Sequence, residues 1–178
     1  MIIEVKDFLK QKECNSIIKK YSSEVTKCTT GEGYSVSGNL KKGNINPFAR
    51  KTDLVVFHNH ALRESIIDTI SNKLNIPVNL IDKYEPFQFL RYKNTGHFAW
   101  HKDITSNREF MTCIVMLNDE FEGGNLLHKK NGEVQEFNKR TGTLHLFPAT
   151  LSHKVAEVTE GVRYSLVTWV YKKPNILI

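Results

Sequence analysis

A series of short runs rich in strand-forming residues fills the chain from Phe87 onward, and it constrains the possible fold more than any other feature. Gly and Asn residues separate the runs, and Asn131-Gly132 is the dipeptide most typical of a two-residue β-hairpin. Many short strands joined by tight turns are typical of β-sandwiches and jelly rolls. We therefore expect a mainly β fold, built from the runs FQFLRY, FMTCIVML, NLLHKK, EVQEF, TLHLF, HKVAEV and RYSLVTWV.

The first part of the chain has helical periodicity instead. Apolar residues recur at helical spacing from Cys14 to Tyr21 and from Leu62 to Leu74, where Asn75-Ile76-Pro77 ends the pattern. We expect two amphipathic helices packed on one sheet, so that residues 1–80 support the β region. Between the helices, residues 29–50 are rich in Gly, Asn and Ser, which predicts a long mobile loop that is a lid or a plain insertion.

Length, charge and cysteine content limit the class of protein. The 178 residues suit one core, and we expect residues 1–178 to form a single domain. The net charge is +6, but the lysines stand singly or in pairs, which favours a solvated surface and leaves nucleic acid as an alternative partner. No apolar stretch approaches the roughly 20 residues that span a bilayer, so we expect no membrane partner. The three cysteines have no CxxC spacing and the N-terminal MIIEVKDFL lacks signal-peptide features, which predicts a cytoplasmic protein.

His101 and Asp103 stand at the head of an apolar run, in HFAWHKDITSNREFMTCIVML. In a strand, residues i and i+2 point to the same face, so this imidazole and carboxylate can meet at one point. Alone they could be an exposed hydrogen-bonded pair, but His153 is a candidate third ligand because it follows Phe147-Pro148 and begins a new run. Two histidines and one carboxylate are typical of non-haem Fe(II) oxygenases, although zinc accepts the same ligands. We assign no metal to the other histidines, which are His58, His60, His97, His128 and His145.

Arg163 and Ser165 form a second candidate site. We expect Glu160-Gly161 to reverse the chain and bring Arg163 back toward the metal. Arg163 and Ser165 then share a strand face, and a guanidinium beside a hydroxyl is a receptor for a carboxylate. The alternative is a surface ion pair between Arg163 and an acidic residue nearby, such as Glu157 or Glu160.

Taken in order, His101-x-Asp103, His153 and Arg163-x-Ser165 resemble the Fe(II)- and 2-oxoglutarate-dependent dioxygenase superfamily, most closely its prolyl 4-hydroxylase-like branch. The resemblance covers about residues 84–171. Further matching features are Tyr92 and Gly96 ahead of His101, TCIVMLN at 112–118, FEGGNL at 121–126, and the Phe147-Pro148 pair.

The resemblance implies a double-stranded β-helix over residues 84–171, with Fe(II) held by His101, Asp103 and His153. It implies 2-oxoglutarate and O2 as cosubstrates, and ascorbate as an optional further cofactor. In this family an arginine, here Arg163, would hold the distal carboxylate of 2-oxoglutarate, helped by Ser165 and Tyr92. The chain has Met116 where related oxygen-sensing prolyl hydroxylases have a tyrosine, so Tyr92 would have to supply the hydroxyl.

Three classes of function remain open from the sequence. The resemblance favours hydroxylation of a prolyl residue in a peptide or protein, with release of succinate and CO2. The same chemistry could act on a free amino acid, another side chain or a nucleic acid, or the chain could be a metal-binding module without turnover. Trp100 and Trp169 are either core residues or the aromatic lining of a substrate groove, because both lie close in sequence to the predicted metal-bearing strands.

Overall fold

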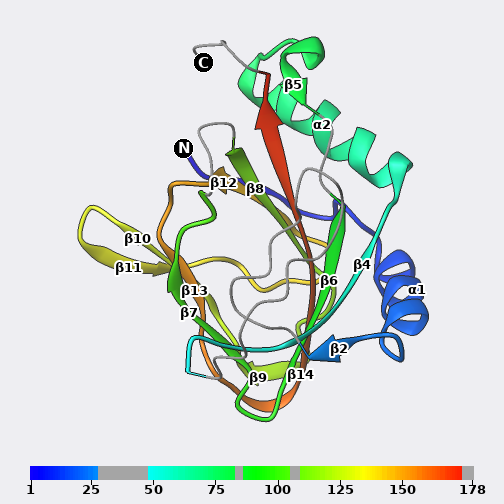
Figure 1. Ribbon diagram of the computed structural model, residues 1–178, viewed down its shortest axis with the longest axis vertical. Helices are drawn as coiled ribbons and strands as arrows, with labels where there is room; N and C mark the ends of the chain where they lie inside the picture. Colours follow the sequence, from blue (N-terminus) through cyan, green and yellow to red (C-terminus); the bar gives the residue numbers. More distant parts are fainter. Residues whose placement is uncertain (28–47, 83–85, 105–108, 174–178) are drawn as a thin grey trace.

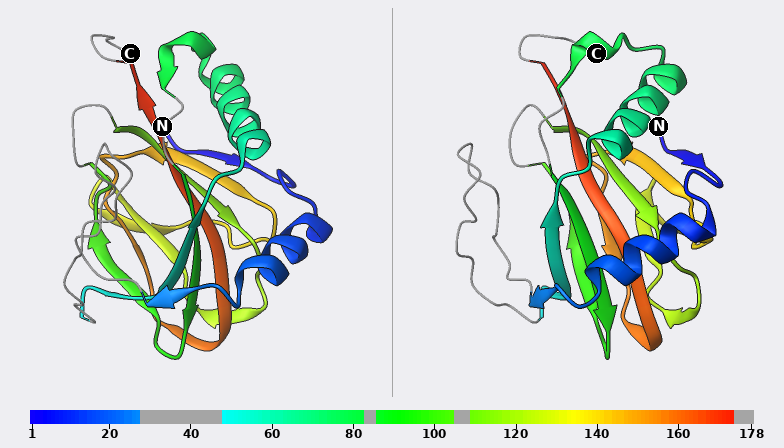
Figure 2. Two further views of the ribbon diagram at one scale, coloured as in Figure 1. Left: turned by 45° about the vertical axis from the view of Figure 1, so that its right-hand side comes forward. Right: turned by 90° about the vertical axis from the view of Figure 1, so that its right-hand side faces the viewer.

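The computed structural model describes residues 1–27, 48–82, 86–104 and 109–173. Two antiparallel sheets face each other, and two α-helices lie against the outside of the larger sheet (Figures 1 and 2). The elements outside the sheets are α1 (Gln11–Tyr21), α2 (His60–Leu74) and the 3-10 helix η1 (Val78–Leu80).

The larger sheet has nine strands, which are β1 (Ile3–Val5), β2 (Thr26–Lys27), β4 (Asp53–Phe57), β5 (Ile81–Asp82), β6 (Phe87–Lys93), β8 (Glu109–Met116), β9 (Phe121–Gly123), β12 (Leu144–Pro148) and β14 (Val158–Lys172). Their order is β1-β12-β8-β14-β6-β4-β2, with β5 and β9 paired to β14. The smaller sheet has five strands in the order β11-β10-β13-β7-β3, which are β3 (Arg50–Lys51), β7 (His97–His101), β10 (Leu126–Lys130), β11 (Glu133–Glu136) and β13 (His153–Val155).

The apolar run in β8 is explained by burial on both faces of the larger sheet. Cys113 and Val115 pack in the cluster that includes the helices, whereas Ile114 and Met116 pack in the cluster between the sheets. A strand buried on both sides needs apolar residues at every position, so the usual alternation of polar and apolar residues is lost.

Both predicted helices are present, and local interactions explain their ends. The side chain of Asn59 accepts a hydrogen bond of 3.1 Å from the backbone N–H of Leu62, which caps the start of α2. Asn75 adopts a left-handed conformation with φ of 54°, two residues before Pro77, and ends the helix. The predicted stop is therefore confirmed.

We predicted a helical structure for the first 80 residues, but they also contain strands. The strands β1 to β4 lie in this part of the chain, and β4 pairs with β6 so that Leu54 faces the cluster between the sheets. The turn predicted at Glu160-Gly161 does not end a strand, because β14 runs from Val158 through Gly161 to Lys172. Gly161 has φ of 75° and allows β14 to bend there, so that its first residues pair with β9 and the rest with β6 and β8.

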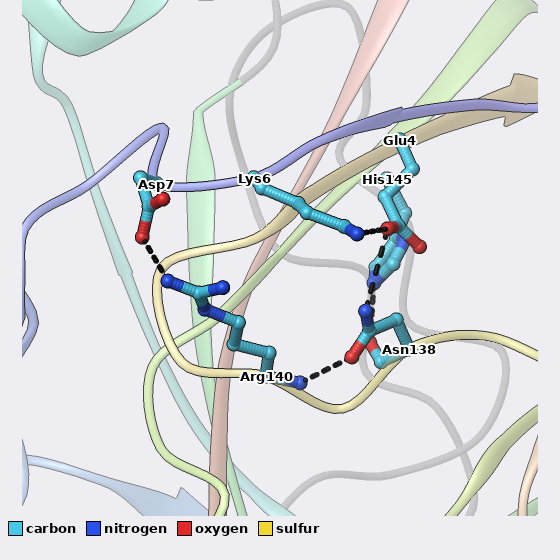
Figure 3. Close-up of polar contacts among 6 residues, drawn as sticks. All are labelled: Glu4, Lys6, Asp7, Asn138, Arg140 and His145. Atoms are coloured by element: carbon cyan, nitrogen blue, oxygen red, sulfur yellow. Dashed lines mark hydrogen bonds and ion pairs between the residues drawn. The ribbon is translucent and has the colours of Figure 1, made fainter.

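The N-terminal strand β1 is attached to the edge of the larger sheet by polar contacts as well as by strand pairing (Figure 3). Glu4 is the cross-strand partner of His145, and its carboxylate accepts a hydrogen bond of 3.3 Å from the amide of Asn138. Nη2 of Arg140 lies 2.8 Å from Oδ1 of Asp7. These contacts join β1 to the segment that leads into β12.

Gly142 lies in the same segment, with φ of 77°, and its backbone is in close contact with Leu9. The carbonyl of Gly142 accepts a hydrogen bond of 3.1 Å from the N–H of Leu9, and a Cβ at Gly142 would lie 2.0 Å from the carbonyl oxygen of Leu9. Only glycine fits this conformation and this space.

We expect Gly142→Ala to lower the free energy of unfolding by roughly 3 kcal/mol or more, because the positive φ and the collision with backbone both cost energy. Gly132→Ala is the matched control, since Gly132 has φ of 84° but nothing lies within 4 Å of the Cβ position. The Gly132→Ala variant should lose only about 1–2 kcal/mol of unfolding free energy. Urea unfolding measures both, and equal losses would show that the contact with Leu9 is unimportant.

Candidate active site

The structure brings His101, Asp103 and His153 together. His101 ends β7, His153 begins β13, and the two residues are directly opposite each other in the antiparallel pairing of these strands. Nε2 of His101 and Nε2 of His153 each lie 3.4 Å from an oxygen of Asp103. One potential ligand atom from each residue lies within 4.8 Å of the others, and no other group in the described part of the chain has this metal-binding arrangement.

Backbone carbonyls orient both imidazole rings. Nδ1 of His101 lies 2.8 Å from the carbonyl oxygen of Ala99, and Nδ1 of His153 lies 3.0 Å from that of Leu151. Because a carbonyl can only accept a hydrogen bond, Nδ1 carries the proton in each ring and donates it. The lone pair is then on Nε2, which faces the common point of the triad.

The third residue of the triad is a buried and ionised carboxylate. Burial alone would raise the pKa of Asp103, but the two neighbouring histidines and a hydrogen bond from Thr112 together hold it at about 2. Oγ1 of Thr112 donates that bond over 2.7 Å. Burial lowers the pKa of His153, which favours the neutral form of this ring. These are the protonation states that metal ligands require.

Arg163 lies in the interior, where only 1% of its surface is exposed. Its guanidinium donates hydrogen bonds to Oγ of Ser165 over 2.9 Å and to Sδ of Met116 over 3.4 Å, and it lies 5.1 Å from the centre of the Tyr92 ring. Its Nε has no hydrogen-bond partner. Among the described residues, no carboxylate is within ion-pair distance, so the alternative of a surface ion pair with a nearby glutamate is wrong.

A buried charge without a counter-charge is costly, and burial accordingly lowers the pKa of Arg163. The surrounding chain makes room for this side chain: a Cβ at Gly124 would lie only 3.2 Å from Cδ of Arg163. The site is therefore built to hold a guanidinium in the interior, where it can bind an anion.

One open cavity of about 400 Å³ connects these groups between the two sheets. His101, Asp103 and His153 line it together with Arg163, and so do Tyr92, Ser165 and Trp169. Trp100 does not line it. Its ring lies instead beside the ammonium groups of Lys129 and Lys154, at 4.8 and 5.3 Å.

Arg50 is a cavity residue that the sequence analysis missed. It pairs with Phe98 across β3 and β7, and its guanidinium lies 4.6 Å from the centre of the Phe98 ring. That ring in turn stacks on His101 at 3.6 Å. No local pattern in the sequence marks Arg50, because only strand pairing brings it to the metal triad. Most of the loop predicted over 29–50 lies outside the described residues.

Comparison with known proteins agrees with this geometry. A family model described as the 2OG-Fe(II) oxygenase superfamily matches residues 87–171, the stretch that carries the triad, Arg163 and Ser165. The chain belongs to this superfamily. The predicted family is confirmed, and the family chemistry uses Fe(II), 2-oxoglutarate and O2. The residues of the site fit these groups. The triad offers nitrogen and carboxylate ligands to iron, and the buried Arg163, which has no acidic partner among the described residues, can bind a carboxylate of 2-oxoglutarate. Ascorbate stays a prediction.

The relatives that this chain matches include PKHD-type hydroxylases. One from Xylella fastidiosa (strain M23) is 26% identical over 155 residues, covering 78% of this chain and 63% of the relative. One from Synechococcus sp. (strain CC9605) is 33% identical over 98 residues, covering 52% of this chain and 44% of the relative. The chain thus spans less than two thirds of the length of these relatives.

Solved structures show the same fold. A Pseudomonas putida prolyl-4-hydroxylase has a TM-score of 0.72 at 15% identity, covering 97% of this chain and 92% of the other. A viral collagen prolyl hydroxylase from Paramecium Bursaria Chlorella virus-1, in a 2OG complex, has a TM-score of 0.67 at 19% identity, covering 97% and 96%. The predicted double-stranded β-helix with helices on one sheet is therefore confirmed. Within the described residues no helix is both long and apolar enough to span a membrane.

The unpaired charge of Arg163 leads to a prediction about stability. Arg163→Met should raise the free energy of unfolding of the ligand-free protein by about 1–4 kcal/mol, because a buried charge without a partner is replaced by an apolar side chain. Thermal and urea unfolding measure this change. Added 2-oxoglutarate with a divalent metal should stabilise the unmodified protein by mass action, and Arg163→Met much less.

Arg91→Met is the control, because Arg91 lies 2.8 Å from Asp53 and also donates to the carbonyl of Ser22. This change should destabilise the protein, since it removes a paired charge and leaves Asp53 without its partner. A loss of stability from Arg163→Met as large as that from Arg91→Met would mean that Arg163 is already compensated without an anion.

Proposed function

We propose that this chain is an Fe(II)- and 2-oxoglutarate-dependent dioxygenase that hydroxylates prolyl residues in a peptide or protein. The observation that carries the proposal is the presence, in one cavity, of a His-Asp-His triad and a buried arginine that has no acidic partner among the described residues. A metal-binding module without turnover would have no use for the second feature. A zinc site would explain the triad, but it would not explain the buried Arg163.

In this proposal the triad binds iron through Nε2 of His101, Nε2 of His153 and the carboxylate of Asp103. Arg163 and Ser165 bind the distal carboxylate of 2-oxoglutarate, with the guanidinium supplying charge and the hydroxyl a further hydrogen bond. When bound, iron and 2-oxoglutarate supply the oxidant: O2 is consumed, 2-oxoglutarate becomes succinate and CO2, and one oxygen atom is inserted into a substrate C–H bond.

Residues in and around the cavity orient these groups and exclude water. Thr112 fixes one oxygen of Asp103, and the stacked Phe98 ring covers His101. Met116 contacts the guanidinium of Arg163 where related enzymes have a tyrosine. Tyr92 presents its ring face to the same guanidinium, and a contribution of its hydroxyl to 2-oxoglutarate binding stays a prediction.

The polar groups near the metal support a prolyl substrate. Nε of Arg50 and Nε1 of Trp169 are buried hydrogen-bond donors without partners, and both residues line the cavity. Proline has no backbone N–H, so a prolyl segment offers mainly carbonyl acceptors near its ring. Unpaired donors in the cavity thus match the acceptors of the substrate. A Trichoplax adhaerens prolyl hydroxylase of the same fold is known in complex with a hypoxia inducible factor peptide fragment, which supports a peptide ligand.

We further propose that residues 1–178 act as one domain in the cytoplasm. Support comes from the shared core, in which Ile66 and Ile70 of α2 pack in the same cluster as Val115 of β8 and Leu166 of β14. Cys14 and Cys113 are buried free thiols, which fits a reducing compartment.

The metal assignment predicts that His101→Ala, Asp103→Ala and His153→Ala each abolish Fe(II) binding. Thr112→Val should weaken it by about 10- to 100-fold, because the hydroxyl that orients the carboxylate is lost. Thr112→Ser keeps the hydroxyl and should restore most of the affinity. Anaerobic titration calorimetry measures these affinities. Normal binding in all three alanine variants would show that the ligands lie elsewhere.

The substrate assignment is tested with a proline-rich peptide. Mass spectrometry should detect one added oxygen on proline and an equal amount of succinate, and both should disappear when the prolines are replaced by alanine. Trp169→Phe keeps the aromatic ring but removes the N–H donor, so the KM for peptide should rise roughly two- to tenfold. The KM for 2-oxoglutarate should not change. Turnover with free proline or an oligonucleotide but not with peptides would replace the prolyl-peptide assignment.

A further inference from the structure

A second open cleft, of about 770 Å³, lies next to the segments that carry the metal triad. We call it the basic cleft because Lys102, Lys129 and Lys130 all line it. Hydroxyl groups of Thr150 and Ser152 also line it, and its apolar lining includes Ile2, Pro148 and Leu151. The cleft thus combines positive charge, hydrogen-bond donors and an apolar surface.

The three lysines have no acidic partner among the described residues. None of the side chains that line the cleft is acidic. Even Glu133, which is opposite Lys130 in the pairing of β10 with β11, forms no ion pair with it. The positive surface continues outside the cleft to Lys154, whose ammonium group lies 5.3 Å from the Trp100 ring. Concentrated positive charge without internal neutralisation attracts an anionic ligand.

The basic cleft and the metal triad share backbone. Lys102 stands between the two triad residues His101 and Asp103 in the chain. The carbonyl of Leu151 orients His153, and the carbonyl of Ser152 accepts a hydrogen bond of 3.0 Å from the N–H of Lys129. Lys102 is exposed and does not line the cavity that holds His101 and Asp103, so the basic cleft lies outside that cavity. A peptide in the extended polyproline II form advances about 3.1 Å per residue and would reach the cleft a few residues beyond a proline at the triad.

We propose that the basic cleft binds acidic side chains of the peptide substrate, a few residues from the proline that is hydroxylated. The proposal rests on the prolyl hydroxylase function proposed above and adds the substrate class: acidic, proline-containing segments. Aspartate and glutamate carboxylates pair with the lysines, while Leu151 and Pro148 contact the apolar parts of the peptide.

A nucleic acid fits these observations less well. Binding of single strands usually combines a positive groove with aromatic rings that stack on the bases. The aromatic ring next to this cleft is Trp100, and the ammonium groups of Lys129 and Lys154 already lie against it. Part of the cleft is also apolar, which suits side chains better than a phosphate backbone.

The test compares two labelled peptides that differ only in their flanking residues. One has glutamates on both sides of a central proline, and the other has glutamines there. Binding is measured by fluorescence anisotropy with Mn(II) in place of Fe(II), so that no turnover is needed. The triple variant Lys102→Gln, Lys129→Gln and Lys130→Gln should weaken binding of the glutamate peptide about tenfold, as expected for three exposed ion pairs. Its binding of the glutamine peptide should not change.

The control is a triple variant with the same loss of charge far from the cleft: Lys12→Gln, Lys19→Gln and Lys73→Gln, three exposed residues of α1 and α2. It should bind both peptides like the unmodified protein. Equal weakening in both triple variants would mean that net charge alone acts, and would overturn the proposal. An oligonucleotide that displaces the glutamate peptide and binds more tightly would overturn it in favour of nucleic acid.

Mass spectrometry of the same peptides with Fe(II), 2-oxoglutarate and O2 separates the two proposals. Lysine-dependent binding of the glutamate peptide without oxygen on its proline would support the basic cleft and refute prolyl hydroxylation. If the unmodified protein and both triple variants bind and hydroxylate the two peptides equally, prolyl hydroxylation is supported and the role of the basic cleft is refuted.

Discussion

The register between β7 and β13 is the constraint on which the candidate active site depends. These strands pair so that His153 lies directly opposite His101. Side chains alternate between the two faces of a sheet, so a slip of one residue would turn His153 away from the cavity and destroy the triad. The backbone carbonyls of Ala99 and Leu151 add a second restraint, because they select the tautomer that leaves Nε2 free for a metal. Strand pairing therefore sets both the position and the chemistry of the histidines.

Charged groups outside the cavity form ion pairs, whereas three buried donors that line it have no partner among the described residues. Arg91 is matched by Asp53, and Asp7 by Arg140. In contrast, Nε of Arg50, Nε of Arg163 and Nε1 of Trp169 have no partners. Each unpaired buried donor costs free energy, and such groups persist where a ligand supplies the missing acceptor. Buried polar atoms without partners also occur outside the cavity, at His128 and Thr143, but the three inside it are donors that face the space for a cosubstrate and a substrate.

The two helices support this arrangement from a distance. They cover the outer face of the larger sheet, so that strands such as β8 are buried on both sides. A sheet packed in this way has few freely moving side chains, which keeps Met116 in contact with Arg163 next to the cavity. The helices on the outer face of the larger sheet thus help to fix the side chains on its inner face. Among the described residues, none from α1 or α2 lines the cavity.

Much of the candidate site could be predicted from the sequence because its signals are local or ordered along the chain. The pair His101-x-Asp103 depends only on the two-residue period of a strand, and Arg163-x-Ser165 on the same rule. Helix ends such as Asn75 depend on neighbouring residues. The ordered set of these residues carries the resemblance from which the family, the double-stranded β-helix and the cosubstrates were predicted.

Only the tertiary structure decided the rest, because it depends on which distant segments meet. Arg50 reaches the cavity through the pairing of β3 with β7, and Lys129 meets Lys102 at the basic cleft although the two are far apart in sequence. The sequence does not distinguish Trp100 from Trp169 as a candidate substrate contact. The structure places Trp100 next to lysines and Trp169 in the lining of the cavity. Local periodicity determines the face on which a side chain lies relative to its own strand, whereas its partners depend on the assembly of the sheets.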